Sequence, residues 1–141
     1  MTNLSEIYDI FLGKISDYSI LELTPFEIED ELFGYFRTAK TRFYKCKNDL
    51  SHVINDAGET IINSKLTDFE KEIIAHLMLV AYMTPIVASS EVLKQSLSDK
   101  DFKIYSQANQ LRELNLLYRL FQKESKKMIT EYSYMGMTDN D

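Results

Sequence analysis

DFKIYSQANQLRELNLLYRLFQKESKKMITEYSY, residues 101–134, is the stretch that decides the fold of this 141-residue chain. Its apolar residues recur at three- and four-residue steps: Leu111, Leu114, Leu117, Tyr118, Phe121, Met128, Ile129 and Tyr132. This spacing predicts one amphipathic helix with Ser106 as its cap and Tyr132 near its end. Such a helix is roughly 40 Å long at 1.5 Å per residue, which exceeds what a compact bundle of this size needs.

Length and composition favour a single globular domain, since 45% of the residues are hydrophobic. Cys46 is the one cysteine, so an intramolecular disulfide and a cysteine zinc cluster are excluded. The opening MTNLSEIYDIF lacks a basic segment followed by an apolar one, and we expect no signal peptide. The longest apolar run, residues 77–82, is too short to span a membrane, so no membrane partner is expected.

Two further helices are predicted in the first third of the chain. Apolar residues at helical spacing indicate a helix over residues 4–18. Thr24, Pro25 and Glu27 then form a capping box with proline at the first helical position, which predicts a helix ending near Asn48. Residues 48–66 break the helical pattern. A two-stranded hairpin, Val53-Ile54 against Ile61-Ile62 around a turn at residues 55–58, is the alternative to an open loop there.

A second capping box, Thr67 with Glu70, starts the most apolar helix. It is apolar nearly all round over residues 73–82, which predicts the buried centre of the core. Proline removes a backbone donor and clashes with the preceding turn, so Pro85 should cause a kink or break near Met83 and Thr84. A second segment to about Leu97 is then expected. A polar linker over residues 98–105 follows. The predicted fold is all-α: a compact bundle of about four main helices in one domain, residues 1–132, with an extended tail, residues 133–141.

The sequence offers no chemistry typical of an enzyme. His76 lies inside the apolar helix without a metal-ligand pattern, and we interpret it as a core or surface histidine. Lys45 and Lys47 flank Cys46 and would lower its pKa, but a small hydrophobic residue near a helix end is the simpler interpretation. The glycines are too scattered for a phosphate loop. We therefore predict no catalytic, cofactor-binding or metal-binding residues.

Charge is distributed unevenly. Residues 1–35 hold eight acids and one lysine, whereas residues 36–51 hold five bases and one acid, within a net charge of −6. Copies of the chain could attract one another head to tail, with Glu29 and Asp30 of one facing Arg37, Lys40 and Lys45, or residues 123–127, of the next. Ordinary matching of side-chain charge to the helix dipole is the alternative. A third interpretation of the charge pattern is that the basic residues 37–45 contact phosphate groups.

Three stretches, taken together, resemble a known family. They are IYDIFLGKISDY (residues 7–18), LTDFEKEIIAHLMLVAYMTPIV (residues 66–87) and SDKDFKIYSQANQLRELNLLYRLFQKESKKMITEYSY (residues 98–134). In order and spacing they resemble the head–tail connector, or neck adaptor, proteins of tailed bacteriophages. The most distinctive parts are Lys100-Asp101-Phe102, Tyr105-Ser106 and Tyr132-Ser133-Tyr134.

The resemblance implies a structural component of the virion neck, made in the host cytoplasm. In that family the protein forms a ring, usually of twelve copies, that docks under the portal protein and receives the stopper or tail. Genomic DNA passes through the channel without specific contacts. The tail would then order on a partner. The expected partner-binding residues are Phe102, Tyr105, Tyr132, Tyr134, Met135 and Met137.

Two other classes stay open. One is a small helical regulatory protein that binds a single protein partner as a monomer or dimer. The other is a small DNA-binding regulator, which the sequence favours least because it has no clear helix-turn-helix with a basic recognition helix.

Overall fold

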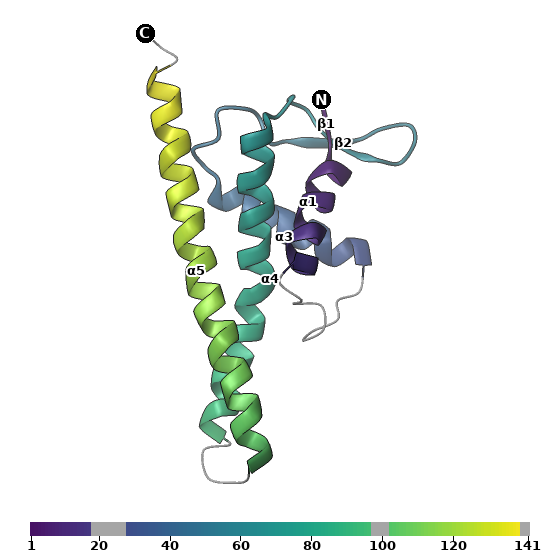
Figure 1. Ribbon diagram of the computed structural model, residues 1–141. Coiled ribbons are helices and arrows are strands. Elements are labelled where there is room, and N and C mark those ends of the chain that lie inside the picture. Colours follow the sequence, from purple (N-terminus) through teal and green to yellow (C-terminus); the bar gives the residue numbers. More distant parts are fainter. Residues whose placement is uncertain (18–27, 97–101, 139–141) are drawn as a thin grey trace.

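The computed structural model describes the backbone of residues 1–17, 28–96 and 102–138, and the side chains of residues 1–15, 31–88 and 112–135 (Figure 1). This part of the chain is mostly helical with a small three-stranded sheet. Its elements, in order, are β1 (Thr2–Asn3), α1 (Leu4–Asp17), α3 (Ile28–Arg42), β2 (His52–Ile54), β3 (Thr60–Ile62), α4 (Asp68–Ser96) and α5 (Phe102–Thr138).

Helix α1 confirms the helix that was predicted over residues 4–18. Of the residues at helical spacing, Leu4, Ile7, Phe11 and Ile15 are buried and form one face of the core, and Tyr8 is half-buried against it. That face packs against α4. The expected last residue, Tyr18, lies outside the described residues.

Helix α3 ends at Arg42, six residues before the predicted end at Asn48. The chain turns after it, where the Cys46 N–H donates to the carbonyl of Phe43 at 3.2 Å. The next backbone donor, the Lys47 N–H, is taken by the Tyr132 hydroxyl at 2.9 Å instead of by a helical carbonyl. A contact with α5 therefore replaces the last expected turns of the helix. The capping box at residues 24–27 lies outside the described residues.

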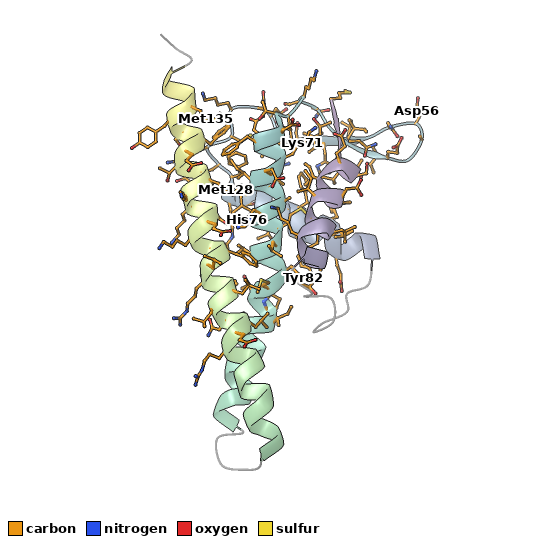
Figure 2. The ribbon with its side chains drawn as sticks, in the orientation of Figure 1. Asp56, Lys71, His76, Tyr82, Met128 and Met135 are labelled. Carbon is orange, nitrogen blue, oxygen red and sulfur yellow. The ribbon has the colours of Figure 1, made fainter. Side chains whose placement is uncertain are left out.

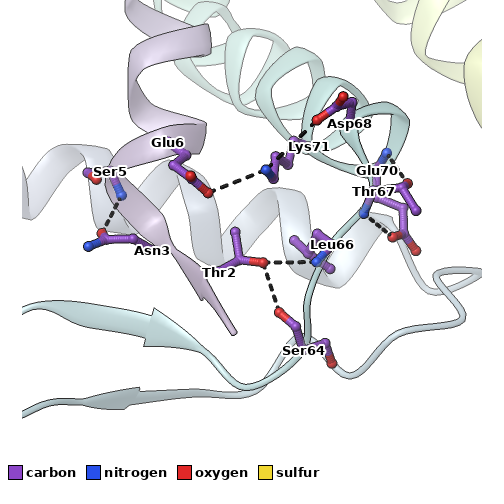
Figure 3. A network of polar contacts seen from close by, with 10 residues as sticks. All are labelled: Thr2, Asn3, Ser5, Glu6, Ser64, Leu66, Thr67, Asp68, Glu70 and Lys71. Carbon is purple, nitrogen blue, oxygen red and sulfur yellow. Dashed lines mark hydrogen bonds and ion pairs between the residues drawn. The ribbon is translucent and has the colours of Figure 1, made fainter.

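The described residues are mostly helical, as predicted, but a small sheet means that the fold is not purely all-α. The sheet also confirms the hairpin. Strands β2 and β3 pair antiparallel, with Val53 opposite Ile61, around a turn in which Gly58 adopts a φ of 80°. Strand β1 adds to the other edge of β3, which gives the order β1-β3-β2. β1 was not predicted. The buried Thr2 anchors it, since its hydroxyl donates to the Ser64 carbonyl at 2.8 Å and accepts from the Leu66 N–H at 2.9 Å (Figure 3).

Helix α4 is buried from Ile73 to Val80, as predicted, but it runs unbroken through Pro85. The predicted break is wrong. Pro85 is on the exposed side of the helix, so water can hydrate the Ala81 carbonyl, which loses its helical donor. One turn of α4 is also tied to α5 at this level, because the Thr84 and Tyr118 hydroxyls are 2.9 Å apart. Packing along α5 thus outweighs the local cost of the proline.

Helices α4 and α5 lie side by side, and their far ends extend beyond α1 and α3 (Figure 1). The described fold is therefore a small body with a projecting helical hairpin, and the prediction of a compact bundle is wrong. Helix α5 starts at Phe102, before the expected cap at Ser106, and is 37 residues long. It continues six residues past Tyr132, so residues 133–138 are helical instead of an extended tail.

One described helical segment, Asp68–Ala88, is long and apolar enough to cross a membrane by length and composition. In this fold 61% of an apolar 18-residue stretch within it is buried inside the protein. It is the central helix of the core, packed by α1, α3 and α5, and that position accounts for its apolar character.

Candidate functional site

A buried polar cluster joins three segments around Glu70, which is 1% exposed. Glu70 completes the predicted capping box: its Oε1 accepts from the Thr67 N–H at 2.8 Å, and its own N–H donates to the Thr67 hydroxyl at 3.1 Å (Figure 3). The same carboxylate also accepts from Asn48 Nδ2 at 2.8 Å and from the Tyr132 hydroxyl at 2.7 Å. The cluster therefore links the loop after α3, the start of α4 and the end of α5.

Tyr132 is part of this cluster and is buried. Its side chain is 8% exposed, and its ring makes an edge contact with Phe43 at a centroid distance of 5.1 Å. Tyr132 was predicted to bind a partner, and in this structure its side chain instead packs inside the protein. Its place in the chain suggested the tail, but α5 continues past it and the apolar stripe of the helix includes it.

The pKa values of Glu70 and Cys46 determine the charge of the cluster. Burial alone would raise the pKa of Glu70, but the hydrogen bonds from the Thr67 backbone, Tyr132, Asn48 and Cys46 outweigh it, and the pKa is lowered. Burial raises the pKa of the Cys46 thiol to about 11, and the neighbouring Glu70 charge adds to this effect. Cys46 is therefore a protonated thiol at neutral pH, and its flanking lysines do not activate it.

His76 is a core histidine, which is one of the two predicted roles. Its Nε2 lies 3.1 Å from the Phe121 carbonyl and 3.4 Å from Glu124 Oε2, so it bridges α4 to α5 (Figure 2). Burial, followed by the charge of Lys14, lowers its pKa. Among the described residues no three His, Cys, Asp or Glu side chains come together as a metal site.

The outer face of α5 exposes large apolar side chains. Leu116 is 60% exposed and Leu120 46%, and nearer the end of the helix Tyr134 is 65% and Met135 52% exposed. Tyr134 and Met135 were predicted to bind a partner, and their exposure is compatible with that role. The side chains of Phe102, Tyr105 and Met137 lie outside the described residues.

Sequence reasoning missed Leu116 and Leu120. A signal was present, because the two leucines are four residues apart and neither belongs to the predicted apolar stripe. Two leucines on the polar side of an amphipathic helix indicate a second contact face.

Basic side chains from two separate segments line one groove between the loop after α3 and the helices α4 and α5. We call it the basic groove; its volume is about 550 Å³. Its apolar part is made by the buried Leu77 and Val80 with the half-buried Ile129. Its exposed rim is made by Arg42, Tyr44, Lys45 and Lys126. The groove thus unites parts of both basic segments that the sequence offered as alternatives.

The remaining predicted charges are spread along α3. Arg37 is exposed and Lys40 is half-buried, and both line a separate shallow depression with His52. Glu29 and Asp30 lie in the first turn of α3, at the opposite end from Arg42. Their side chains lie outside the described residues. The structure therefore places the predicted acidic groups in the first turn of α3 and the predicted basic groups from the middle of α3 to the loop after it.

No protein family model, no curated protein and no solved structure matches this chain.

Proposed function

We propose that this protein is a structural adaptor of a tailed-bacteriophage neck, which assembles as a ring under the portal and connects the head to the stopper or tail. The observation that carries the proposal is the projecting hairpin of α4 and α5, combined with the sequence resemblance of residues 7–18, 66–87 and 98–134 to connector proteins. A helical hairpin that extends beyond its own domain presents surface for neighbouring molecules (Figure 1).

The end of α5 supports a contact with the portal or another neck protein. Tyr134 and Met135 expose an aromatic ring and a flexible thioether on the last turns of a rigid helix. Such side chains fill pockets on partner surfaces at a small entropic cost, because the helix already orders the backbone. Leu116 and Leu120 extend the apolar surface along the same helix.

Docking on heads tests the proposal directly. We expect the full-length protein to co-sediment with DNA-filled, tailless heads that display the portal, in several copies per head. Heads without a portal should not bind it. A protein that ignores portal-bearing heads, or that binds one other protein with one-to-one stoichiometry, would favour the small regulatory protein instead.

Truncation locates the contact. Deletion after Ser133 removes Tyr134 and Met135 but leaves Tyr132 and the Glu70 cluster intact, so the protein should fold normally. We expect its affinity for portal-bearing heads to fall at least about tenfold, as for the loss of about 1.4 kcal/mol of hot-spot contacts. Deletion after Thr138 is the matched control and should dock like the full-length chain. Full docking by the shorter variant would show that the end of α5 is not the portal contact.

A further inference from the structure

We propose that the basic groove is the receptor half of the contact between neighbouring copies, and that its occupant is the acidic beginning of α3 from a second copy. The inference rests on the proposed ring and deepens it by naming the two surfaces that meet. We define the acidic segment as residues 20–31, ILELTPFEIEDE.

The groove is built to receive an apolar segment that carries negative charge. Arg42, Lys45 and Lys126 are exposed on its rim, and none of them forms an ion pair with a carboxylate of the described residues. No acidic residue lines it within the described part of the chain. Tyr44, 79% exposed, adds an aromatic side chain of the kind enriched at the centres of protein interfaces.

The acidic segment has the complementary composition. It holds five carboxylates and no base, and it alternates these with apolar residues. Its acids are Glu22, Glu27, Glu29, Asp30 and Glu31, and its apolar residues are Ile20, Leu21, Leu23, Phe26 and Ile28. Glu31, whose side chain the structure describes, is exposed. Complementary charge of this kind steers encounter and fixes register, while the apolar side chains supply burial.

Helix α3 itself identifies the occupant as a second copy. Glu31 and Arg42 lie on the same helix, eleven residues apart in sequence. At 1.5 Å per residue they are separated by roughly 17 Å along the helix axis. Figure 1 shows α3 crossing the molecule, with its Ile28 end away from α5 and its Arg42 end beside α4 and α5. The rigid helix keeps the start of α3 away from the groove of its own chain.

Two complementary surfaces at opposite ends of one element make a head-to-tail contact. Such a contact is heterologous, so repeated copies generate a closed ring when the rotation closes and a filament when it does not. The residues at the end of α5, with Asp139 and Asp141 beyond it, are a weaker candidate occupant because they offer fewer acids in this span.

Photo-cross-linking from the rim identifies the occupant. Benzoylphenylalanine replaces Tyr44 in the full-length chain, which is mixed with an isotope-labelled copy at low salt, about 20 mM, where surface charges act over a long range. We expect cross-links from position 44 to residues 20–36 of the labelled copy, and their yield should fall several-fold at about 500 mM salt. Cross-links that map to residues 134–141 or elsewhere, or no cross-link between copies, would overturn the proposal.

Charge reversal provides an independent measurement. The triple variants R42E/K45E/K126E and E29K/D30K/E31K should each reduce the cross-link yield at least about tenfold, and the chain that carries all six substitutions should recover most of it. If the cross-link yield recovers in the chain with six substitutions, misfolding is excluded as the cause of the loss. If the yield does not recover, the proposed pairing of the basic groove with the acidic segment is contradicted. Docking on portal-bearing heads is measured separately with the unsubstituted chain. Cross-linking without docking would contradict the proposed neck function but support the contact between copies. Docking without cross-linking would support the neck function and contradict the contact between copies.

Discussion

Replacing Glu70 by alanine is expected to lower the free energy of unfolding by about 3–5 kcal/mol. The substitution removes the shared acceptor of the Thr67 N–H, the Asn48 amide, the Tyr132 hydroxyl and the Cys46 thiol. A buried donor left without an acceptor costs about 1–3 kcal/mol, and water can rescue part of this set because Asn48 and Cys46 are half-buried. Chemical denaturation of both proteins at neutral pH gives the difference.

Acid should reduce the same difference, because it removes the part that depends on the charge of Glu70. The folded-state pKa of Glu70 lies below its ordinary value of 4.5, so its charge stabilises the fold fully above that pH. This contribution is lost as the pH falls through the lower, folded-state pKa. Stability of the wild-type chain should therefore fall toward that of the Glu70→Ala variant as the solution is acidified.

Glu72→Ala is the matched control on the same helix. Glu72 is 46% exposed and forms an ion pair with Lys14 at 3.0 Å, which in water contributes about 0–1 kcal/mol. A loss at Glu72 equal to the loss at Glu70 would show that the cluster has no special role and that both carboxylates act only through charge on α4.

The Glu70 cluster also shows where prediction from sequence ends. The capping box of Thr67 and Glu70 is local, three residues apart, and the sequence predicts it correctly. Tyr132 meets the same carboxylate across 62 residues of sequence, and no periodicity encodes that meeting. The hairpin was an open alternative because its turn at residues 55–58 is local. Strand β1 was missed because two residues are too few to show an alternating pattern.

For the candidate surfaces, too, the sequence predicts what is local, whereas contacts between distant segments depend on the fold. The sequence shows basic residues around the end of α3 and in the second half of α5. Only the fold brings Arg42 and Lys45 together with Lys126 in one groove. Tyr132 and Tyr134 are two residues apart and looked equivalent in the sequence. The direction of the helix faces separates them, since one is 8% and the other 65% exposed.

Pro85 is the position where a local rule and the tertiary structure disagree. Proline costs about 3 kcal/mol relative to alanine inside a helix. The sequence therefore predicted a break, but α4 spans Asp68–Ser96 without one. The hydrophobic faces of α4 and α5 are buried together on both sides of the proline, with Met83 and Val87 in the core. A break would expose part of this surface, and keeping the helix whole is the smaller cost.

Pro85→Ala is accordingly expected to stabilise the protein by about 2 kcal/mol. Alanine restores the N–H that the Ala81 carbonyl lacks and removes the ring that crowds it, which is worth about 3 kcal/mol. About 1 kcal/mol of this is offset because proline also restricts the unfolded chain. Pro85 is exposed, so the smaller side chain leaves no cavity. Thermal and chemical unfolding measure the gain.

Ala88→Pro tests the same argument in the opposite direction. Ala88 is also exposed, three residues further along α4, and its N–H is a helical donor that proline would remove. We expect this variant to lose about 2–3 kcal/mol, because the new ring crowds the Thr84 carbonyl one turn earlier. If Pro85→Ala were neutral or destabilising while Ala88→Pro lost stability, α4 would have to be adapted to a proline at position 85. The unbroken helix would then depend on that residue instead of tolerating it.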